Sequence, residues 1–350
     1  MSDTTAASRE ALGLSGPPGG GHGGPGALRG SLRVLARQRE ATVLLVTVIL
    51  LLYFGLRYSS TFVSNTNAVD LLSENAAPII IIAIGEVFLL ICGQIDLSVG
   101  FIYTLSPFIM YFLITYYHFP AFLAIIAALV MGVIAGWVNG FITVTLGVPS
   151  FITTLGTGFV LDGIVLTTSH AYPVGIPKQA LTLGRFIGTD PYSQIIWAVI
   201  LTAIFYVVLN RTRWGLHTIA TGGNQLGARE SGINVGRVTY GNFMITGFMG
   251  ALVGLQVAFY GNTVDPSAGG YEPMFLAVTA AVIGGTAMLG GQGTIIGAFL
   301  GAIVISTISD GFDIAGVSAN PQPIIYGGAI LIAMIANVRL ARLRAAGSSL

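Results

Sequence analysis

The sequence predicts an all-α protein that crosses a membrane about ten times. Of its 350 residues, 54% are hydrophobic and only 8% are charged, whereas a soluble domain carries roughly 25% charged residues. The apolar residues also form long blocks instead of short strands or single amphipathic helix faces, as in helices that span a bilayer. A surface exposed to water cannot be built from so few charges, so a soluble fold is excluded.

Ten apolar blocks, separated by polar, glycine or proline residues, are expected to form the spanning helices. The blocks are residues 41–57, 68–92, 97–117, 119–143, 150–169, 193–210, 238–260, 274–290, 295–311 and 323–338. Several are shorter than the roughly 20 residues that a straight spanning helix needs, so we expect extended, tilted or broken helices. Pro78, Pro107 and Pro149 mark positions where a helix could be interrupted, which a membrane protein tolerates only against other protein or a wet cavity.

The cationic residues predict which side of the membrane each loop occupies. The first cluster comprises Arg9, Arg29, Arg33, Arg37 and Arg39, the second Arg211, Arg213, Arg229 and Arg237, and the third Arg339, Arg342 and Arg344. Ten spans put all three clusters on one side, which the positive-inside rule identifies as the cytoplasm, together with both termini. Eight or twelve spans would do the same, whereas an odd number would divide the clusters.

The two ends of the chain are expected to lie outside the membrane domain. Residues 1–40 are rich in glycine and proline between Gly13 and Gly30, so they predict a disordered cytoplasmic tail. This tail lacks the early apolar stretch of a cleavable signal peptide, so the first span should remain as an anchor. Residues 341–350 predict a short cytoplasmic tail, which leaves residues 41–340 as one transmembrane domain.

Glycine spacing predicts where helices approach each other closely. Two ladders with a glycine at every fourth position occur in the fourth and ninth predicted spans: Gly132, Gly136 and Gly140, and Gly293, Gly297 and Gly301. Such small-residue faces let helix backbones pack together in a membrane. The ladders lie five spans apart, and therefore in oppositely oriented helices, which suggests an inverted repeat of five helices.

A polar stretch, Gly93–Gly100, interrupts the apolar sequence between the second and third spans. Its Gln94, Asp96 and Ser98 suggest backbone held open beside a water-filled path, because a charge near hydrocarbon normally faces protein or water. Alternatively, Asp96 caps the following helix in an ordinary turn. The two interpretations are compatible, because capped half-helices are how transporters expose helix ends.

Three further polar residues lie well inside predicted spans. Glu86 and Asp162 could line a solute route or exchange protons, or they could be neutral, hydrogen-bonded structural acids. The same ambiguity applies to Asn139. We take Glu86 and Asn139, with the three side chains of the polar stretch, as candidate residues of a substrate path.

Residues 211–237 form the longest predicted cytoplasmic segment between spans. Gly222-Gly223-Asn224 is a start signal in which Asn224 caps a short helix from about Gln225 to Ser231, and Gly232 is the stop. Two turns of helix are marginal in water alone, so this helix is expected to dock on a partner. The alternative is a solvated connector that carries arginines.

Several chemistries are excluded. The only lysine, Lys178, is followed by Gln179, so the chain has no phosphate-binding loop and does not hydrolyse ATP by that route. Its four histidines are isolated and Cys92 is its only cysteine, so no metal or disulfide site is expected. The net charge of +1 does not indicate the strongly basic surface of a nucleic-acid-binding protein. We therefore predict no catalytic residue and no cofactor in this chain.

Five sequence blocks, in order, resemble the permease subunits of ribose-type monosaccharide ABC importers. They are Gly93–Gly100 (GQIDLSVG), Val148–Gly156 (VPSFITTLG), Gly222–Arg237 (GGNQLGARESGINVGR), Asp265–Tyr271 (DPSAGGY) and Ile283–Gly297 (IGGTAMLGGQGTIIG). The resemblance covers about residues 41–340. Gln94 stands where the family has glycine, and Gly227 stands where alanine is usual, which makes the short helix less stable.

The resemblance implies a fold of about ten helices, a homodimeric or paired permease, and an extracytoplasmic solute-binding protein. It also implies a cytoplasmic ATP-binding subunit, which would bind ATP and Mg²⁺. The residues assigned to contact with that subunit are Gly222, Gly223, Asn224, Arg229, Glu230, Gly232 and Arg237. The expected function is inward transport of a small sugar (a monosaccharide or polyol) by alternating access in a bacterial-type inner membrane.

Two alternatives stay open at this point. The same architecture could import a branched-chain amino acid, a nucleoside or a small signalling molecule. A different class, a proton-coupled carrier, could work through Glu86, Asp96 or Asp162.

Overall fold

The computed structural model describes residues 39–317, 324, 326–328, 331 and 335. The predicted tail of residues 1–40 lies outside this range except for its last two residues, which begin the first described helix. The tail 341–350 and most of the tenth predicted span, 323–338, also lie outside it.

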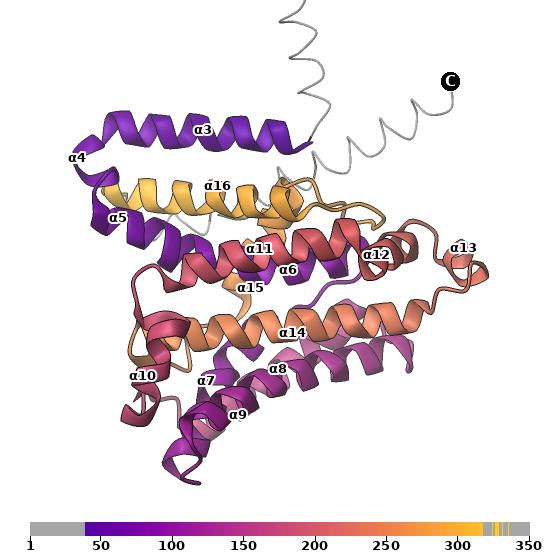
Figure 1. The fold of residues 1–350 in the computed structure, drawn as a ribbon, viewed down its shortest axis with the longest axis horizontal. Coiled ribbons are helices and arrows are strands. Elements are labelled where there is room, and N and C mark those ends of the chain that lie inside the picture. The colour runs from indigo at the N-terminus through magenta and orange to yellow at the C-terminus, as the bar shows by residue number, and fades with distance from the viewer. Residues whose placement is uncertain (1–38, 318–323, 325, 329–330, 332–334, 336–350) are drawn as a thin grey trace, which may run out of the picture. The chain divides into compact units, whose positions relative to one another are not determined.

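Helices make up nearly all of the regular structure of the described residues (Figure 1). They are α3 (Arg39–Arg57), α4 (Ser59–Phe62), α5 (Asn65–Val69), α6 (Ala77–Ile91), α7 (Val99–Thr115), α8 (Ala121–Val144), α9 (Ser150–Ser169), α10 (Leu181–Gly184), α11 (Ser193–Arg211), α12 (Arg213–Gly223), α13 (Gln225–Glu230), α14 (Val235–Tyr260), α15 (Tyr271–Ile283) and α16 (Ile295–Ile314). A π-helical stretch, Asp70–Ala76, joins α5 to α6, and a second one, Arg185–Thr189, follows the 3-10 turn Lys178–Ala180 and α10. Two short antiparallel strands, β1 (Val174–Gly175) and β2 (Thr263–Val264), pair Val174 with Val264.

Within the described residues, seven helices are long and apolar enough to cross a membrane, and α7 and α15 are shorter apolar helices. These nine correspond to the first nine predicted spans, so the prediction of an all-α, multi-pass membrane protein is confirmed. The predicted span 274–290 is wrong at its end, because α15 stops at Ile283. Gly285 then turns the chain with a φ of +96°, a conformation that glycine adopts readily.

The three prolines behave differently from one another. Pro149 directly precedes α9, where a missing N–H costs nothing. Pro78 follows the π-helical stretch Asp70–Ala76 inside one continuous helix, Asn65–Ile91. Pro107 was expected to interrupt a helix but lies inside a continuous α7. Its missing N–H leaves the Tyr103 carbonyl without that donor, and Gly254 of α14 packs there, since an added Cβ would lie 1.9 Å from Tyr103 O.

The antiparallel helices α6 and α14 form the buried centre of the molecule. Every residue of α6 is buried, and Gly85 packs so closely that an added Cβ would lie 2.8 Å from the Cα of Thr246. Near the end of α6, the Phe88 carbonyl accepts a 3.2 Å hydrogen bond from Asn242 Nδ2 of α14. Both helices are therefore mostly apolar or small-residue, as largely enclosed membrane helices are.

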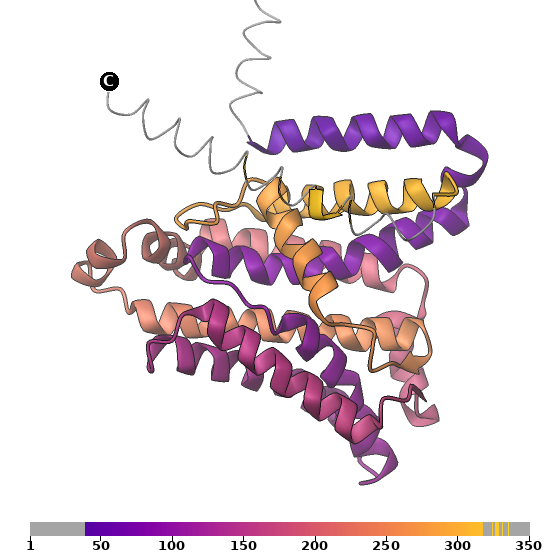
Figure 2. The same cartoon turned by 180° about the vertical axis from the view of Figure 1, so that it is seen from behind.

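The short helices α7 and α15 begin at the same place. Gly270 N donates a 3.1 Å hydrogen bond to Gly100 O, and the rings of Phe101 and Tyr271 meet edge to face at 4.9 Å. Each short helix follows a long buried helix and a non-helical stretch (Figure 2). The inverted repeat stays a prediction. The helix contacts are compatible with it, because the short helix α7 packs on the long helix α14 and the short helix α15 packs on the long helix α6. Each short helix therefore packs on the long helix that precedes the other short helix.

The two glycine ladders lie at close helix contacts, with one exception. An added Cβ would lie 2.4 Å from Gly247 O at Gly132 and 2.2 Å from Phe243 O at Gly136, while Gly140 packs on Tyr240. The first ladder therefore joins α8 to α14. In the second, Gly297 and Gly301 join α16 to α15 in the same way, at 2.0 Å from Gly284 O and 2.1 Å from Ala280 O. Gly293 was wrongly assigned to the helix, because it precedes α16 and packs on Ile91.

Candidate functional site

The polar stretch predicted between the second and third spans is a true break in the helix. Gly93, with a φ of +70°, ends α6, and its N–H and that of Gln94 bond to the carbonyls of Leu90 and Leu89, each at 2.9 Å. This is the Schellman arrangement, in which glycine closes a helix. Residues 92–98, which we call the polar break, then run back into the bundle to the start of α7 (Figure 2).

Asp96 is the centre of the polar break and is fully buried. Its Oδ1 accepts hydrogen bonds from Ser98 N at 2.8 Å and Ser98 Oγ at 2.6 Å, and both of its oxygens lie 3.3 Å from Asn139 Nδ2 of α8. Asn139 Nδ2 also donates to Ser98 Oγ at 2.7 Å. The carboxylate thus satisfies the N–H of Ser98 ahead of α7. Helix α7 itself begins without a side-chain cap, so Asp96 braces the break and does not cap the helix as the alternative interpretation predicted.

Helix α9 holds the polar break from the other side. Thr154 Oγ1 accepts a 3.0 Å hydrogen bond from Leu97 N, and Ser150 Oγ accepts one from Ile95 N at 3.3 Å. Thr157 Oγ1 donates to Asn139 Oδ1 at 2.7 Å. Side chains of α8 and α9 therefore replace the hydrogen bonds that the broken helix gives up, as membrane backbone requires.

Glu86 lies beside this network, and Gln94 does not belong to it. Glu86 is fully buried; its Oε2 is 3.5 Å from Asp96 N, and its Oε1 has no partner among the described residues. Four of the five predicted path residues (Glu86, Asp96, Ser98 and Asn139) therefore meet in one place. Gln94 is half-buried two residues away, where no side-chain hydrogen bond holds it among the described residues.

The segment 211–237, which we call the coupling segment, is more helical than the sequence predicted. Helix α12 (Arg213–Gly223) was missed, because arginines and glycines hide its pattern. Gly215, Thr218 and Thr221 are its buried residues, and this spacing of three small residues was the available signal. Thr212 caps it by accepting from Gly215 N at 3.4 Å.

The short helix predicted after α12 is present as α13, one residue shorter than expected. Asn224 Oδ1 accepts from Gly227 N at 3.0 Å, and Gly232, with a φ of +80°, closes the helix. The side chains of Arg229, Glu230 and Arg237 are exposed. The coupling segment therefore presents a charged surface on a helix anchored at both ends.

Three glycine-rich segments meet at the end of α6, in a contact that we call the glycine junction. An added Cβ at Gly222 would lie 1.5 Å from Ile91 O and 2.8 Å from Gly291 N. Gly291 N donates a 2.7 Å hydrogen bond to Ile91 O, and the Cα of Gly223 is 3.1 Å from an added Cβ at Gly291. The end of α12, the end of α6 and the loop before α16 therefore touch through main-chain atoms.

Asn242 of α14 ties α12 to α6 beside this junction. Its Oδ1 accepts from Trp214 Nε1 at 2.9 Å. Its Nδ2 lies 3.2 Å from Phe88 O, 3.2 Å from Cys92 Sγ and 3.4 Å from Thr218 Oγ1. This fully buried amide was not identified from the sequence, since nothing distinguishes it from other asparagines in spans.

The five sequence blocks singled out above converge around the polar break. Ser150 and Thr154 of the second block hold it, and Gly222 of the third and Gly291 of the fifth contact Ile91 next to it. Gly270 of the fourth bonds to Gly100, the last residue of the first block, just beyond the break. Blocks separated by up to about 200 positions therefore form a single site.

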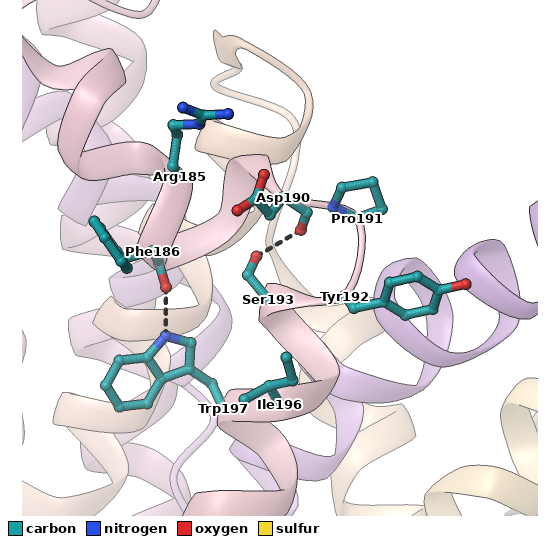
Figure 3. Close-up of a pocket in the computed structure, with 8 residues that line it drawn as sticks. All are labelled: Arg185, Phe186, Asp190, Pro191, Tyr192, Ser193, Ile196 and Trp197. Atoms are coloured by element: carbon teal, nitrogen blue, oxygen red, sulfur yellow. Dashed lines mark hydrogen bonds between the residues drawn. The ribbon is translucent and has the colours of Figure 1, made fainter.

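Two surface cavities lie elsewhere, along the segment between α9 and α11. One, of about 460 Å³, is lined by Arg185, Phe186, Asp190, Pro191, Tyr192, Ser193, Ile196 and Trp197 (Figure 3). Trp197 Nε1 donates to Phe186 O at 2.8 Å and Ser193 Oγ to Asp190 O at 2.7 Å. The second, of about 530 Å³, shares Arg185. Neither is lined by a residue of the polar break.

Comparison with known proteins identifies the family. Residues 68–335 match the family described as branched-chain amino acid transport system / permease component. The chain is 36% identical over 310 residues to the xylose/arabinose import permease protein XylH of Sulfolobus acidocaldarius, covering 86% of this chain and 85% of that protein. It is 31% identical to the ribose import permease protein RbsC of Haemophilus influenzae (87% and 94% covered) and 30% identical to the fructose import permease protein FrcC of Rhizobium meliloti (84% and 84% covered).

No solved structure matches the chain at a comparable level of significance. The match over residues 68–335 takes in the polar break, the coupling segment and the glycine junction. Together with the three permeases, it shows that the chain belongs to the permease family of ABC importers, the membrane-spanning transport components of those systems.

Proposed function

We propose that this permease carries a small sugar, a monosaccharide or polyol, into the cell by alternating access, driven by ATP hydrolysis in a partner subunit. The observation that carries the proposal is the glycine junction. It connects the exposed coupling segment to the polar break, where four buried polar side chains meet. A movement imposed on α12 and α13 therefore reaches the break without an intervening side chain.

The coupling segment is the proposed contact with the ATP-binding subunit. Gly222, Gly223 and Gly232 shape it, Asn224 caps α13, and Arg229, Glu230 and Arg237 are exposed on it. ATP and Mg²⁺ belong to that partner, because this chain has no phosphate-binding loop. ATP binding can shift the permease between outward and inward states only through different contacts in the two states.

Both termini and the coupling segment are proposed to be cytoplasmic. This orientation is supported by a hydrogen bond from Thr294 Oγ1 to Glu40 Oε1, which brings the start of α3 to the end of the bundle that carries the glycine junction. A solute-binding protein then meets the opposite face, and a second copy of the chain completes the transporter as a homodimer.

A sugar as the solute is supported by the chemistry of the path and by the relatives. The polar side chains around Asp96 are hydrogen-bonding groups with no cation paired to them in the described part of the chain, which suits a neutral polyhydroxylated solute. The three relatives are named for xylose and arabinose, ribose and fructose.

The test begins with purification of the tagged permease in mild detergent. We expect a subunit with Walker motifs to copurify in stoichiometric amount. Proteoliposomes of that complex with the solute-binding protein should take up radiolabelled xylose, arabinose, ribose or fructose when ATP is supplied. A permease that purifies without an ATPase and moves solute in response to a proton gradient would overturn the proposal.

The coupling segment is tested by Arg229→Ala combined with Glu230→Ala. Both side chains are exposed, so fold and membrane insertion should be unchanged while the copurifying ATPase and ATP-dependent uptake are lost. The matched control is Arg185→Ala, an exposed arginine at the other end of α11. Uptake that persists in the double variant at the control's level would remove the assigned role.

A further inference from the structure

Asp162 is an acidic residue in the middle of α9, a spanning helix that is mostly exposed on the surface of a single chain. Only 22% of its spanning window is buried. Asp162 is half-buried between Phe159, which is 60% exposed, and the buried Val165. No hydrogen bond or cation holds its carboxylate among the described residues. A carboxylate in this position cannot face lipid without a cost of a few kcal/mol, so it faces protein or water.

Aromatic rings from three helices meet at Tyr271, and one of them, Phe159, lies three residues before Asp162 on α9. The ring of Tyr271, at the start of α15, lies 6.1 Å from Phe159 of α9, 4.9 Å from Phe101 of α7 and 6.3 Å from Phe275. Phe159 and Phe275 are 60% and 45% exposed. Gly158 brings α9 close enough for this, since an added Cβ would lie 2.9 Å from Phe101 Cδ2. Phe159 and Phe275 thus present exposed rings, and Phe159 lies one helical turn from Asp162.

The Tyr271 hydroxyl is a polar group without a partner. Its oxygen is inaccessible and makes no hydrogen bond within the described residues, although Asp162 acts on it electrostatically. Leaving a buried hydroxyl unbonded is costly, so a hydrogen-bond acceptor from outside the described residues would stabilise this position. Tyr271 follows Gly270, whose N–H bonds to Gly100 beside the polar break.

We propose that Phe159 and Asp162 of α9, with Tyr271 of α15, form a subsite for the sugar on its way to the polar break. The exposed rings pack against the apolar C–H face of a sugar ring. The carboxylate accepts from sugar hydroxyls, and the Tyr271 hydroxyl donates to them when its ring turns out of the enclosed position. Apolar surface with a few directed polar groups is the usual composition of small-molecule sites. The inference rests on the proposed function and assigns its specificity to named residues.

Water access to the subsite is tested by cysteine labelling of the complete transporter in proteoliposomes. In a Cys92→Ser background, which removes the only native thiol, Asp162→Cys should react with a membrane-impermeant cationic thiosulfonate. The transported sugar should slow that reaction. The matched control is Ile164→Cys, at a similar depth on a different, exposed face of α9, which should not react. An unreactive Asp162→Cys, or one that no transported sugar protects, overturns the subsite.

Specificity is tested by uptake of xylose, arabinose, ribose and fructose. Asp162→Asn should raise the KM of the transported sugar about tenfold, because one charge-assisted hydrogen bond is lost. The maximal rate should change less. Tyr271→Phe should do the same, and Phe159→Trp should reorder the four sugars. Unchanged KM values in all three variants overturn the subsite and leave the proposed function intact. Transport of none of the four sugars by the unmodified complex removes the proposed function, and the subsite with it.

Discussion

The polar break and the glycine junction lie next to each other, but they are held together by different kinds of atoms. The polar break is fixed by its own side chains and those of α8 and α9, with Asp96 accepting from Ser98 and Asn139 and Thr154 accepting from Leu97 N. The glycine junction is fixed by main-chain atoms, with Ile91 O against Gly222 and bonded to Gly291 N.

This difference determines what each site tolerates. A side-chain network keeps its shape when one member is replaced by a group of similar size that makes some of the same hydrogen bonds. A contact between main-chain atoms has no side chain to adjust, so any added carbon must move a helix. We therefore expect function to require hydrogen-bonding side chains at the polar break and residues without a side chain at the glycine junction.

The largest effect is expected from Gly222→Ala. Its new Cβ would lie 1.5 Å from Ile91 O, so α12 must leave α6. The free energy of unfolding should fall by about 3 kcal/mol, the upper part of the range for overpacking, and ATP-dependent uptake should be lost. The thermal transition can be followed in detergent through the fluorescence of the chain's three tryptophans.

Its matched control is the adjacent Gly223→Ala, where an added Cβ meets nothing within 4 Å and φ is not positive. This variant should keep a transition temperature close to that of the original protein. Equal losses in the two variants would show that the contact with Ile91 is not what makes Gly222 necessary.

A smaller effect is expected at the polar break, from Asp96→Ala. The change leaves the N–H and hydroxyl of Ser98 and the amide of Asn139 without their acceptor. One unpaired buried group costs about 1–3 kcal/mol, and rearrangement of the others should keep the total near 2 kcal/mol. Asp96→Asn, which keeps one acceptor oxygen, should recover part of the lost transition temperature. An asparagine variant no more stable than the alanine variant contradicts the network described here.

The smallest effect is expected from Asn224→Ala, outside both sites. The variant removes the cap that accepts from Gly227 N, which is worth about 1 kcal/mol to a helix. Because α13 has only six residues, the loss should appear as faster hydrogen exchange in residues 225–230, with little change in the overall transition temperature. Asn210→Ala is the comparison, since this exposed amide bonds only to Tyr206 O of its own helix within the described part of the chain. Equal exchange rates in α13 of both variants would argue against the cap.

Most of the fold could be predicted from the sequence because helix ends are encoded locally. Asn224 and Gly232 predict the two ends of α13 to within one residue. Pro149 directly precedes α9, at the position where the sequence predicted that a helix could be interrupted. The end of α15 was misplaced because residues 284–290 remain apolar while Gly285 turns the chain. Helix α12 was missed because a helix that buries only small residues on one side lacks an apolar stripe.

The site could be predicted only in part. Asp96, Ser98 and Asn139 stand out as polar residues in or between apolar blocks, and the structure brings them together. Asn242, Thr154 and Gly291 do not stand out, since their roles depend on which helix packs beside them. The meeting of five distant blocks at one place is tertiary information, which spacing along the chain does not contain.

The length of α14 has a consequence for the depth of the whole bundle. Its 26 residues extend for about 39 Å at 1.5 Å per residue, roughly 9 Å more than a typical hydrocarbon core. Tilting by about 20° removes only about 2 Å of this surplus, so at least one end of α14 lies among lipid headgroups. Arg237 is exposed in the first turn of α14. When this first turn extends beyond the hydrocarbon core, Arg237 lies at the level of the lipid phosphates. The helix that carries the most internal contacts then also holds the protein at a fixed level in the bilayer.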